Sequence, residues 1–192
     1  CGCMKANRAA NQLRIIAGRW RGRKLSFAPA PGVRPTPDRV RETLFNWLSP
    51  GINGARCLDL FAGSGALGIE AASRGASRVV LVDNDTAVVT QLRAQLAVLQ
   101  ATQVEVVQAN VDRWLAGQAE RFDIVFLDPP FREGLLPGCM AALAANGWLA
   151  ANAIIYIEAE RHYELVLPAG WELLRSKHAG QVDYHLAQSV SG

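Results

Sequence analysis

The spacing of apolar and polar positions changes character at about residue 56. From there, short continuous apolar runs alternate with longer segments that contain regularly spaced apolar residues. Continuous runs predict strands that are buried on both faces, and the longer segments predict the helices that cover them. We predict strands at 56–61, 78–82, 104–108, 122–127 and 153–157, and helices at 66–73, 86–99, 111–116 and 135–145.

The order of these segments indicates the fold class. Strands that alternate with helices form a parallel sheet with helices on both faces. Two further β-like stretches, 171–176 and 182–187, are separated by a turn that contains glycine, and they predict an antiparallel pair that closes the sheet. We therefore expect an α/β protein with a mostly parallel sheet.

The first 50 residues follow a different pattern. Two short β-like pieces, 13–16 and 24–27, flank a turn bounded by glycines and predict a hairpin. A proline-rich link at 29–37 leads into a helix, which Thr36 or Asp38 is expected to cap. We therefore divide the chain into a basic extension, 1–50, and a larger domain, 51–192.

Composition narrows the class of protein. The chain has 192 residues, of which half are hydrophobic, so it can form one globular core. Its apolar runs fall short of the roughly 18 residues of a membrane span, and its polar N-terminus does not resemble a signal peptide. The four cysteines match neither a disulfide framework nor a zinc pattern. We expect a cytoplasmic protein without a membrane segment or a metal.

The net charge of +3 conceals an asymmetry along the chain. Ten of the 20 Lys and Arg residues lie within residues 1–41, together with a single acidic residue, Asp38. The rest of the chain carries ten basic and 16 acidic residues. A basic arm on an acidic body predicts a nucleic-acid partner. Trp20 stands among arginines in this arm and is expected either to stack on RNA or to pack the hairpin onto the body.

A glycine-rich loop follows the strand predicted at 56–61 and opens the next helix. It contains Gly63-Ser64-Gly65-Ala66-Leu67-Gly68, and Asp83 follows 18 residues after Gly65, at the end of the next strand. Glycines allow a ligand to approach the backbone, and an acid at the second strand can accept the hydroxyls of a ribose. The loop therefore predicts an adenosine-containing ligand, and alone it does not separate an NAD-type cofactor from S-adenosylmethionine.

Two acidic features favour S-adenosylmethionine. Asp59 lies four residues before Gly63, where it can meet an ammonium group but would repel a diphosphate. Asp128-Pro129-Pro130-Phe131 directly follows the strand predicted at 122–127. The prolines stiffen this turn, so one carboxylate and one carbonyl face outward beside an aromatic ring. This set, which we call the rim, suits an exocyclic amine on a planar heterocycle and has no role in hydride transfer.

These motifs resemble those of class I S-adenosylmethionine-dependent methyltransferases, and specifically of the bacterial 16S rRNA guanine-N2 methyltransferases of the RsmD type. The resemblance covers about residues 13–188. It rests on the segment 34–46, which begins Arg34-Pro35-Thr36-Pro37, on the loop 59–68, on the rim and on Ala179-Gly180-Gln181-Val182. The loop and rim are shared by many amino-methyltransferases, whereas the arginine–proline segment narrows the family.

The resemblance implies a Rossmann-like seven-stranded methyltransferase sheet with an antiparallel last strand and a small N-terminal hairpin. It implies S-adenosylmethionine as cofactor and 16S rRNA of an assembled or assembling small ribosomal subunit as partner, for a protein expected to be a monomer. The expected cofactor-binding residues are Asp59, Phe61, Ala62, Gly63, Ser64, Gly65, Asp83, Asn84, Asn110 and Val111. The expected RNA-binding residues are Arg19, Trp20, Arg21, Arg23, Lys24, Arg34, Thr36 and Arg39. Many methyltransferases carry an acid at the position of Asn110, which leaves the adenine contact open.

The implied reaction is methyl transfer to the N2 amine of a guanine, with Asp128, Pro129, Pro130 and Phe131 as the catalytic residues. Asp128 and the Pro129 carbonyl would hold the two N–H groups, and Phe131 would stack on the base. Whether Asp128 or water takes the proton stays open. Two alternatives remain: an adenine-N6 methyltransferase on DNA or RNA, and a nucleic-acid-binding assembly factor without turnover. The intact loop and rim argue against the assembly factor, and only the N-terminal segment argues against adenine.

Overall fold

The computed structural model describes residues 11–27 and 36–190. Its elements, in chain order, are β1 (Asn11–Arg14), β2 (Lys24–Phe27), α1 (Asp38–Leu48), β3 (Arg56–Asp59), α2 (Ala66–Ser73), β4 (Arg78–Asp83), α3 (Thr86–Leu99), β5 (Val104–Gln108), α4 (Val111–Leu115), β6 (Phe122–Leu127), α5 (Leu135–Ala145), β7 (Leu149–Glu160), β8 (Trp171–Ala179) and β9 (Val182–Ser189).

Seven strands form one sheet in the order β5-β4-β3-β6-β7-β9-β8. The first five are parallel to their neighbours, and β9 runs antiparallel to both β7 and β8. The expected α/β class, the mostly parallel seven-stranded sheet and the antiparallel last strand are confirmed. β1 and β2 form a separate antiparallel hairpin, as expected.

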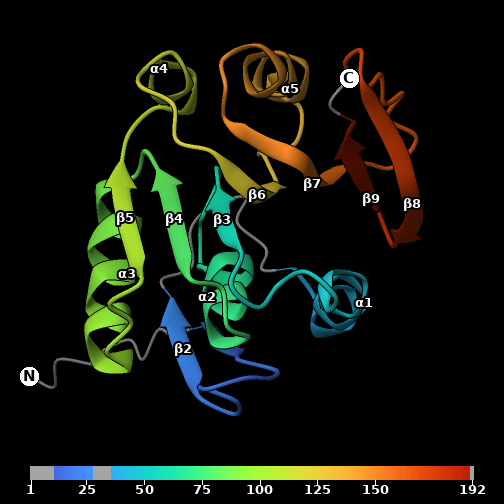
Figure 1. Cartoon of the computed structure of the whole chain (residues 1–192). Coiled ribbons are helices and arrows are strands. Elements are labelled where there is room, and N and C mark those ends of the chain that lie inside the picture. Colours follow the sequence, from blue (N-terminus) through green and yellow to red (C-terminus); the bar gives the residue numbers. More distant parts are fainter. Residues whose placement is uncertain (1–10, 28–35, 191–192) are drawn as a thin grey trace, which may run out of the picture.

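Helices cover both faces of the sheet because alternate strand residues point to opposite sides. On one face, α1, α2, α3 and the hairpin enclose a core that includes Cys57, Leu81 and Phe126. On the other face, α4 and α5 cover Leu58 and Leu127. Figure 1 shows these two layers on either side of the strands. The continuous apolar runs of the sequence therefore reflect burial on both faces.

Several element ends differ from the prediction. β1 covers Asn11–Arg14 instead of 13–16, β3 ends at Asp59 instead of 61, and β8 continues to Ala179 instead of 176. β7 extends over Leu149–Glu160, beyond the predicted 153–157. Its acidic end pairs with β9, with Glu158 opposite Tyr184, so the charge does not end the strand. Neither expected cap serves α1: Pro37 occupies the N-cap position without a side-chain hydrogen bond. Thr36 instead donates to Glu158 at 3.1 Å, and Asp38 pairs with Arg41 at 2.6 Å.

The N-terminal hairpin is fastened to the C-terminal half of α2. The N–H groups of Ile16 and Ala17 donate to the Glu70 carboxylate at 2.9 and 3.0 Å. Gly18 has a φ of 82°, and a Cβ atom there would lie 1.9 Å from the Ser73 carbonyl oxygen. Such a close approach, in a left-handed conformation, requires glycine. The hairpin thus shares the core of the sheet, and the division at residue 50 stays a prediction.

Candidate active site

The sheet order brings the separately predicted ligand contacts to one edge. The strands β5, β4, β3 and β6 lie side by side. Asn110, Asp83, Asp59 and Asp128 stand at their carboxyl ends or in the loops that follow. The chain passes from β3 outward to β4 and β5 and then returns to β6 on the other side of β3. Ligands of open α/β sheets bind at such a switch point, which here lies between Asp59 and Asp128.

The glycine loop has the tight geometry that its sequence predicts. Gly63 and Gly65 have positive φ angles of 51° and 79°. Gly65 occupies the N-cap position of α2 without a side-chain cap. The N–H group of Gly63 donates to Asp83 Oδ2 at 3.0 Å, which ties the loop to the end of β4. Phe61 is half-buried, whereas Ala62 and Ser64 are buried.

Asp59 is a buried acid with one satisfied oxygen. It is 1% exposed, and its Oδ2 accepts the N–H group of Gly68 at 3.1 Å. Its Oδ1 is buried and lacks a hydrogen-bond partner among the described residues. Burial raises the pKa of Asp59 to about 7, although backbone N–H groups of Gly68 and Phe61 oppose the rise and Asp83 and Glu158 add to it. A buried acceptor without a donor fits the ammonium group of a ligand.

The residues expected to contact the ribose and the adenine, Asp83 and Asn110, lie at the end of β4 and shortly after β5. Asp83 is half-buried and accepts the N–H groups of Gly63 and Asp85 at 3.0 and 2.9 Å. Each of its oxygens keeps acceptor capacity for a hydroxyl group. Asn110 caps α4, because its Oδ1 accepts the N–H group of Arg113 at 3.2 Å. Asn84 is exposed, and Val111, which follows Asn110, is 9% exposed.

The rim follows β6 directly. Asp128 is half-buried, Pro129 is buried, and Pro130 and Phe131 are exposed, the phenyl ring by 43%. Burial, the negative charge of Glu158 and that of Asp59 hold the pKa of Asp128 well above its ordinary range. The rim therefore presents an exposed ring beside an acid that is enclosed by other acids.

Sequence reasoning missed two residues beside this rim. Glu158 is 5% exposed and accepts the hydroxyl groups of Thr36 and Tyr156 at 3.1 and 2.8 Å. Burial raises the pKa of Glu158 despite these donors. Tyr163 is 37% exposed and lines a small cavity with Glu158, Pro129 and Phe131. Phe131 and Tyr163 are the only exposed aromatic residues in the described part of the chain.

One signal could have identified Glu158. It directly follows the apolar run at 153–157, where an acid without a partner would be costly to bury. Tyr163 had no comparable signal, because it lies in a polar segment after β7.

The expected RNA-binding residues fall into three groups. Arg19, Arg21, Arg23 and Lys24 are exposed on the hairpin, and Arg39 is exposed on α1. Trp20 and Thr36 are buried, at 6% and 5% exposure, so Trp20 packs the hairpin onto the body and Thr36 supports the rim. Arg34 lies outside the described residues.

The hairpin arginines do not alternate along a strand. The segment between β1 and β2 is built of bends and turns, as its glycines predict, so Arg19, Arg21 and Arg23 do not lie on one face of an extended strand. This turn lies at the C-terminal end of α2, where Arg19 N–H donates to the Ser73 carbonyl at 2.7 Å. The rim lies at the opposite edge of the sheet, as Figure 1 shows for the hairpin below α2 and the strand ends above it.

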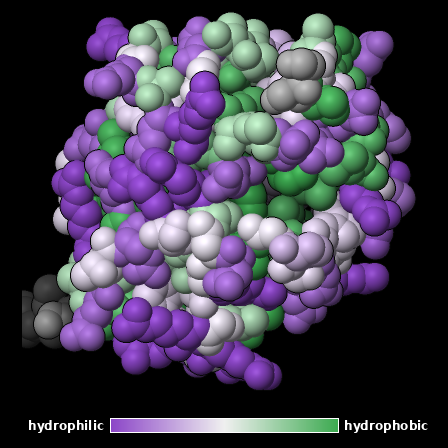
Figure 2. All heavy atoms as spheres, viewed as in Figure 1, coloured by the Kyte–Doolittle hydropathy of each residue, from purple (hydrophilic) through white to green (hydrophobic). Residues whose placement is uncertain are grey.

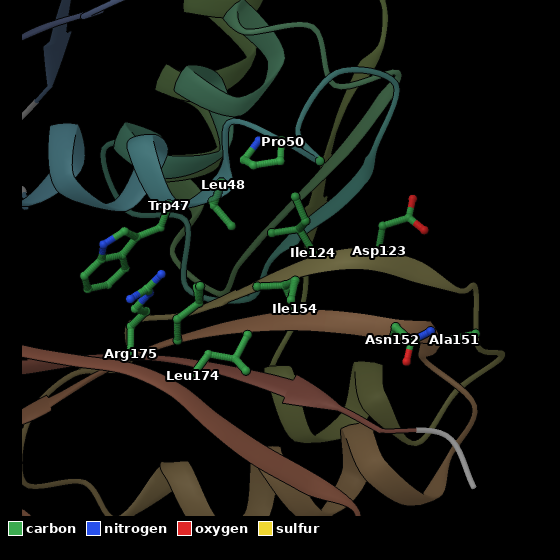
Figure 3. Close-up of a pocket in the computed structure, with 12 residues that line it drawn as sticks. Trp47, Leu48, Pro50, Asp123, Ile124, Ala151, Asn152, Ile154, Leu174 and Arg175 are labelled. Carbon is green, nitrogen blue, oxygen red and sulfur yellow. The ribbon is translucent and has the colours of Figure 1, made fainter.

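A separate cavity lies away from these residues. A hollow of about 630 Å³ is lined by Trp47, Asp123, Ile154 and Leu174, among others. Figure 2 shows it as a hydrophobic recess, and Figure 3 shows its walls from α1, β6, β7 and β8. Asp123 lies at the amino end of β6, so the hollow is remote from the glycine loop and the rim. Chemistry, rather than size, therefore locates the candidate active site.

The part of the chain that the structure describes contains no helix with the length and apolar character of a membrane span. It also contains no group of three or more His, Cys, Asp or Glu side chains placed to hold a metal ion.

Comparisons with known proteins agree with this geometry. A family model described as conserved hypothetical protein 95 matches residues 13–188. Ribosomal RNA small subunit methyltransferase D of Escherichia coli K12 is 54% identical over 180 residues, which cover 93% of this chain and 91% of the relative. The solved structure of the E. coli putative methyltransferase yhhF has a TM-score of 0.87 and 54% identity, and the match covers 95% of this chain and all of that chain.

A more distant structure contains ligands. The 16S rRNA N2 G1207 methyltransferase RsmC of Thermus thermophilus was solved in complex with AdoMet and guanosine. It has a TM-score of 0.67 and 26% identity, and the match covers 94% of this chain and 50% of that chain.

Proposed function

The chain belongs to the conserved hypothetical protein 95 family, which includes ribosomal RNA small subunit methyltransferase D, and we propose that it methylates the N2 amine of a guanine in 16S rRNA with S-adenosylmethionine as cofactor. One observation carries the proposal. The strand order places Asn110, Asp83, Asp59 and Asp128 side by side along one edge of the sheet. In this spatial order they would meet the adenine, the ribose and the ammonium group of an extended cofactor, and then the acceptor base.

The residues present fit the cofactor. The buried Oδ1 of Asp59, which lacks a partner, would accept a hydrogen bond from the ammonium group of the cofactor. Asp83 would accept hydrogen bonds from the ribose hydroxyl groups. The loop from Phe61 to Gly65 would pack along it, while Asn84, Asn110 and Val111 would border the adenosine. When bound, S-adenosylmethionine supplies an electrophilic methyl group on a sulfonium whose leaving group is neutral.

The rim would then position the nucleophile. Guanine N2 donates its lone pair into the purine ring, so its reactivity depends on holding the nitrogen in a pyramidal state. Asp128 and the Pro129 carbonyl would accept the two N–H groups, and Pro130 would stiffen the turn. Phe131 would stack on the base, worth roughly 1–3 kcal/mol. A paired base must first be flipped out of its stack. The methylated nitrogen then loses a proton to a rim carboxylate or to water.

The position of the basic residues favours a large substrate. Arg39 follows Thr36 by three residues and lies near the rim, as does the exposed Arg132. The arginines of the hairpin turn lie at the other edge of the sheet, so RNA must extend across the molecule to touch both. An assembled or assembling small ribosomal subunit offers such a surface. We accordingly assign RNA binding to 1–50 and methyl transfer to 51–192, in a monomeric protein of the bacterial cytoplasm.

Mass spectrometry of nucleosides tests the proposal. Small ribosomal subunits from a strain that lacks the gene are incubated with the purified protein and isotopically labelled S-adenosylmethionine. We expect label in N2-methylguanosine of 16S rRNA, and none when Asp128 is replaced by alanine. Labelled N6-methyladenosine would favour the adenine alternative. Binding to subunits without any labelled nucleoside would favour the assembly factor.

A further inference from the structure

Glu158 occupies a position that the methyl-transfer scheme above does not use. The register of β6 and β7 pairs Leu127 with Ile157, so the next residues along both strands, Asp128 and Glu158, are neighbours. Burial and then the negative charge of Glu158 raise the pKa of Asp128, because the two carboxyl groups are close to each other. Two acids this close at the carboxyl ends of neighbouring strands form a row of acceptors.

The surroundings of Glu158 hold its carboxylate in a fixed orientation. Thr36 and Tyr156 both donate to Oε1, so neither of these hydrogen bonds uses Oε2. The residue is 5% exposed and lines the small cavity that Phe131 and Tyr163 also line. An acceptor that is oriented by two donors and lies next to Asp128 of the rim is suited to read the edge of a planar base.

Guanine and adenine differ at the atom beside the reactive amine. In guanine, N1 carries a hydrogen next to the N2 amine, so this edge is a row of donors. In adenine, N1 next to the N6 amine carries a lone pair. A carboxylate beside the bound amine would accept the guanine N1–H, whereas it would repel the lone pair of adenine N1.

We propose that Glu158 is the residue that selects guanine, by accepting the N1–H group while Asp128 and the Pro129 carbonyl hold the N2 amine. This inference rests on the proposed function and adds a specificity-determining residue to it. It also gives a physical reason for preferring guanine-N2 over adenine-N6 methylation, which the rim alone does not supply.

Base analogues test the inference without any substitution. Guanosine, inosine and 2-aminopurine riboside are titrated against the wild-type protein saturated with S-adenosylhomocysteine, with NMR as readout. Inosine keeps N1–H but lacks the amine, whereas 2-aminopurine keeps the amine but has a lone pair at N1. We expect guanosine to bind roughly 10- to 100-fold more tightly than 2-aminopurine riboside, as for loss of a hydrogen bond to a charged group. Equal affinities, or no measurable binding of guanosine, would overturn the inference.

Two matched variants test whether Glu158 is the residue that selects guanine. Glu158→Gln offers both a carbonyl and an amide N–H at the same place, so guanosine and 2-aminopurine riboside should bind within about threefold of each other. Glu160→Gln removes the next acid on the same strand, which also lines the cavity, and should keep the wild-type preference. Unchanged affinity for S-adenosylhomocysteine shows that both variants are folded. Loss of the preference in Glu160→Gln, or its retention in Glu158→Gln, would assign the role elsewhere.

Methylation of small subunits distinguishes a failure of the proposed function from a failure of the role of Glu158. If the wild-type protein forms N2-methylguanosine but shows no preference between the two nucleosides, only the role of Glu158 fails. If it forms no N2-methylguanosine, the proposed function fails and the role of Glu158 fails with it.

Discussion

The hydroxyl group of Thr36 donates a 3.1 Å hydrogen bond to Glu158, which lies 122 residues later in the chain. Both residues are buried, and Glu158 lies next to Asp128 of the rim, because β6 and β7 are in register at Leu127 and Ile157. The N-terminal extension is therefore a part of the wall behind the candidate active site, in addition to carrying basic residues.

Thr36→Val tests this link. It removes the donor with little change of shape and leaves Glu158 with one hydrogen bond fewer. A buried hydrogen bond to a charged group contributes about 1.5–3 kcal/mol, so we expect kcat/KM for subunit methylation to fall at least tenfold. Affinity for S-adenosylmethionine, measured by calorimetry, should be unchanged. Thr36→Ser keeps the donor and should stay within about threefold of wild type, and an equal loss in both variants would contradict the role of the hydroxyl group.

Much of this arrangement follows from the sequence, because it depends on local patterns. The apolar runs predict the strands β3 to β6, and the residue types of the glycine loop and the rim indicate their function. The partnership of Glu158 with Asp128 was not predictable in this way. It depends on β7 lying next to β6 in a particular register, and that is a property of the whole sheet. An acid at the end of an apolar run has no local mark of burial, since its buried partners are far away in sequence.

Trp20 and the N-cap of α1 also depend on contacts that local sequence patterns do not predict. A tryptophan among exposed arginines has no local mark that assigns it to the core, yet it is 6% exposed. Thr36 and Asp38 have side chains suited to cap a helix, and each has found a stronger tertiary partner instead. Local propensity fails where a distant charged group competes for the same side chain.

Asp128→Ala should abolish methyl transfer and leave cofactor affinity nearly unchanged, because the residue is expected to face the acceptor base. Retention of more than about a tenth of wild-type turnover corresponds to a loss below roughly 1.4 kcal/mol and would contradict the proposed role. Asp123→Ala, at the amino end of the same strand, is the matched control. Turnover is measured on subunits from the deletion strain, and affinity by calorimetry with S-adenosylhomocysteine.

The stability of the ligand-free protein should fall as pH rises. Burial raises the pKa of Asp59 to about 7 from 3.8, so the folded protein binds this proton more tightly than the unfolded chain does. The stabilisation is complete below about pH 4 and is lost as pH rises through about 7, at a total on the order of 4 kcal/mol. Asp128 and Glu158, whose pKa values are also raised, contribute with the same sign.

Urea unfolding of wild type and Asp59→Asn between pH 5 and pH 8 measures this contribution. The variant should lose less stability over this range than wild type does, and its affinity for the cofactor should be weaker. In wild type, cofactor affinity should rise over the same range, since an ionised Asp59 attracts the ammonium group. Parallel stability curves for the two proteins would show that Asp59 does not titrate there.

Two glycines of the hairpin turn form a matched pair. Both have a φ near +80°. A Cβ atom at Gly18 would lie 1.9 Å from the Ser73 carbonyl oxygen, whereas a Cβ atom at Gly22 would meet no atom of the surrounding structure within 4 Å. Gly22→Ala should lower the free energy of unfolding by about 1 kcal/mol, the cost of the left-handed conformation. Gly18→Ala should lower it by at least 1–3 kcal/mol more, since the backbone must shift. Equal losses in denaturant unfolding would mean that the hairpin does not pack on α2.

The exposed arginines of the hairpin turn, Arg19, Arg21 and Arg23, are expected to contact RNA phosphates. Each phosphate contact releases counterions, so binding to RNA depends steeply on salt. Replacing all three with alanine should weaken subunit binding and reduce the slope of log K against log salt concentration by up to about 3. Cofactor affinity should not change, because the turn and the glycine loop lie at opposite edges of the sheet.

Arg175→Ala with Lys177→Ala, on β8, removes two positive charges outside the turn and controls for net charge when effects are compared per charge removed. Binding is measured by filter retention of labelled small subunits over a range of potassium chloride concentrations. An equal effect of the β8 pair would show that the hairpin responds only to overall charge. An unchanged slope in the triple variant would mean that the turn serves to pack the extension on α2, and the RNA-binding surface would then have to be sought around Arg39 and Arg132, beside the rim.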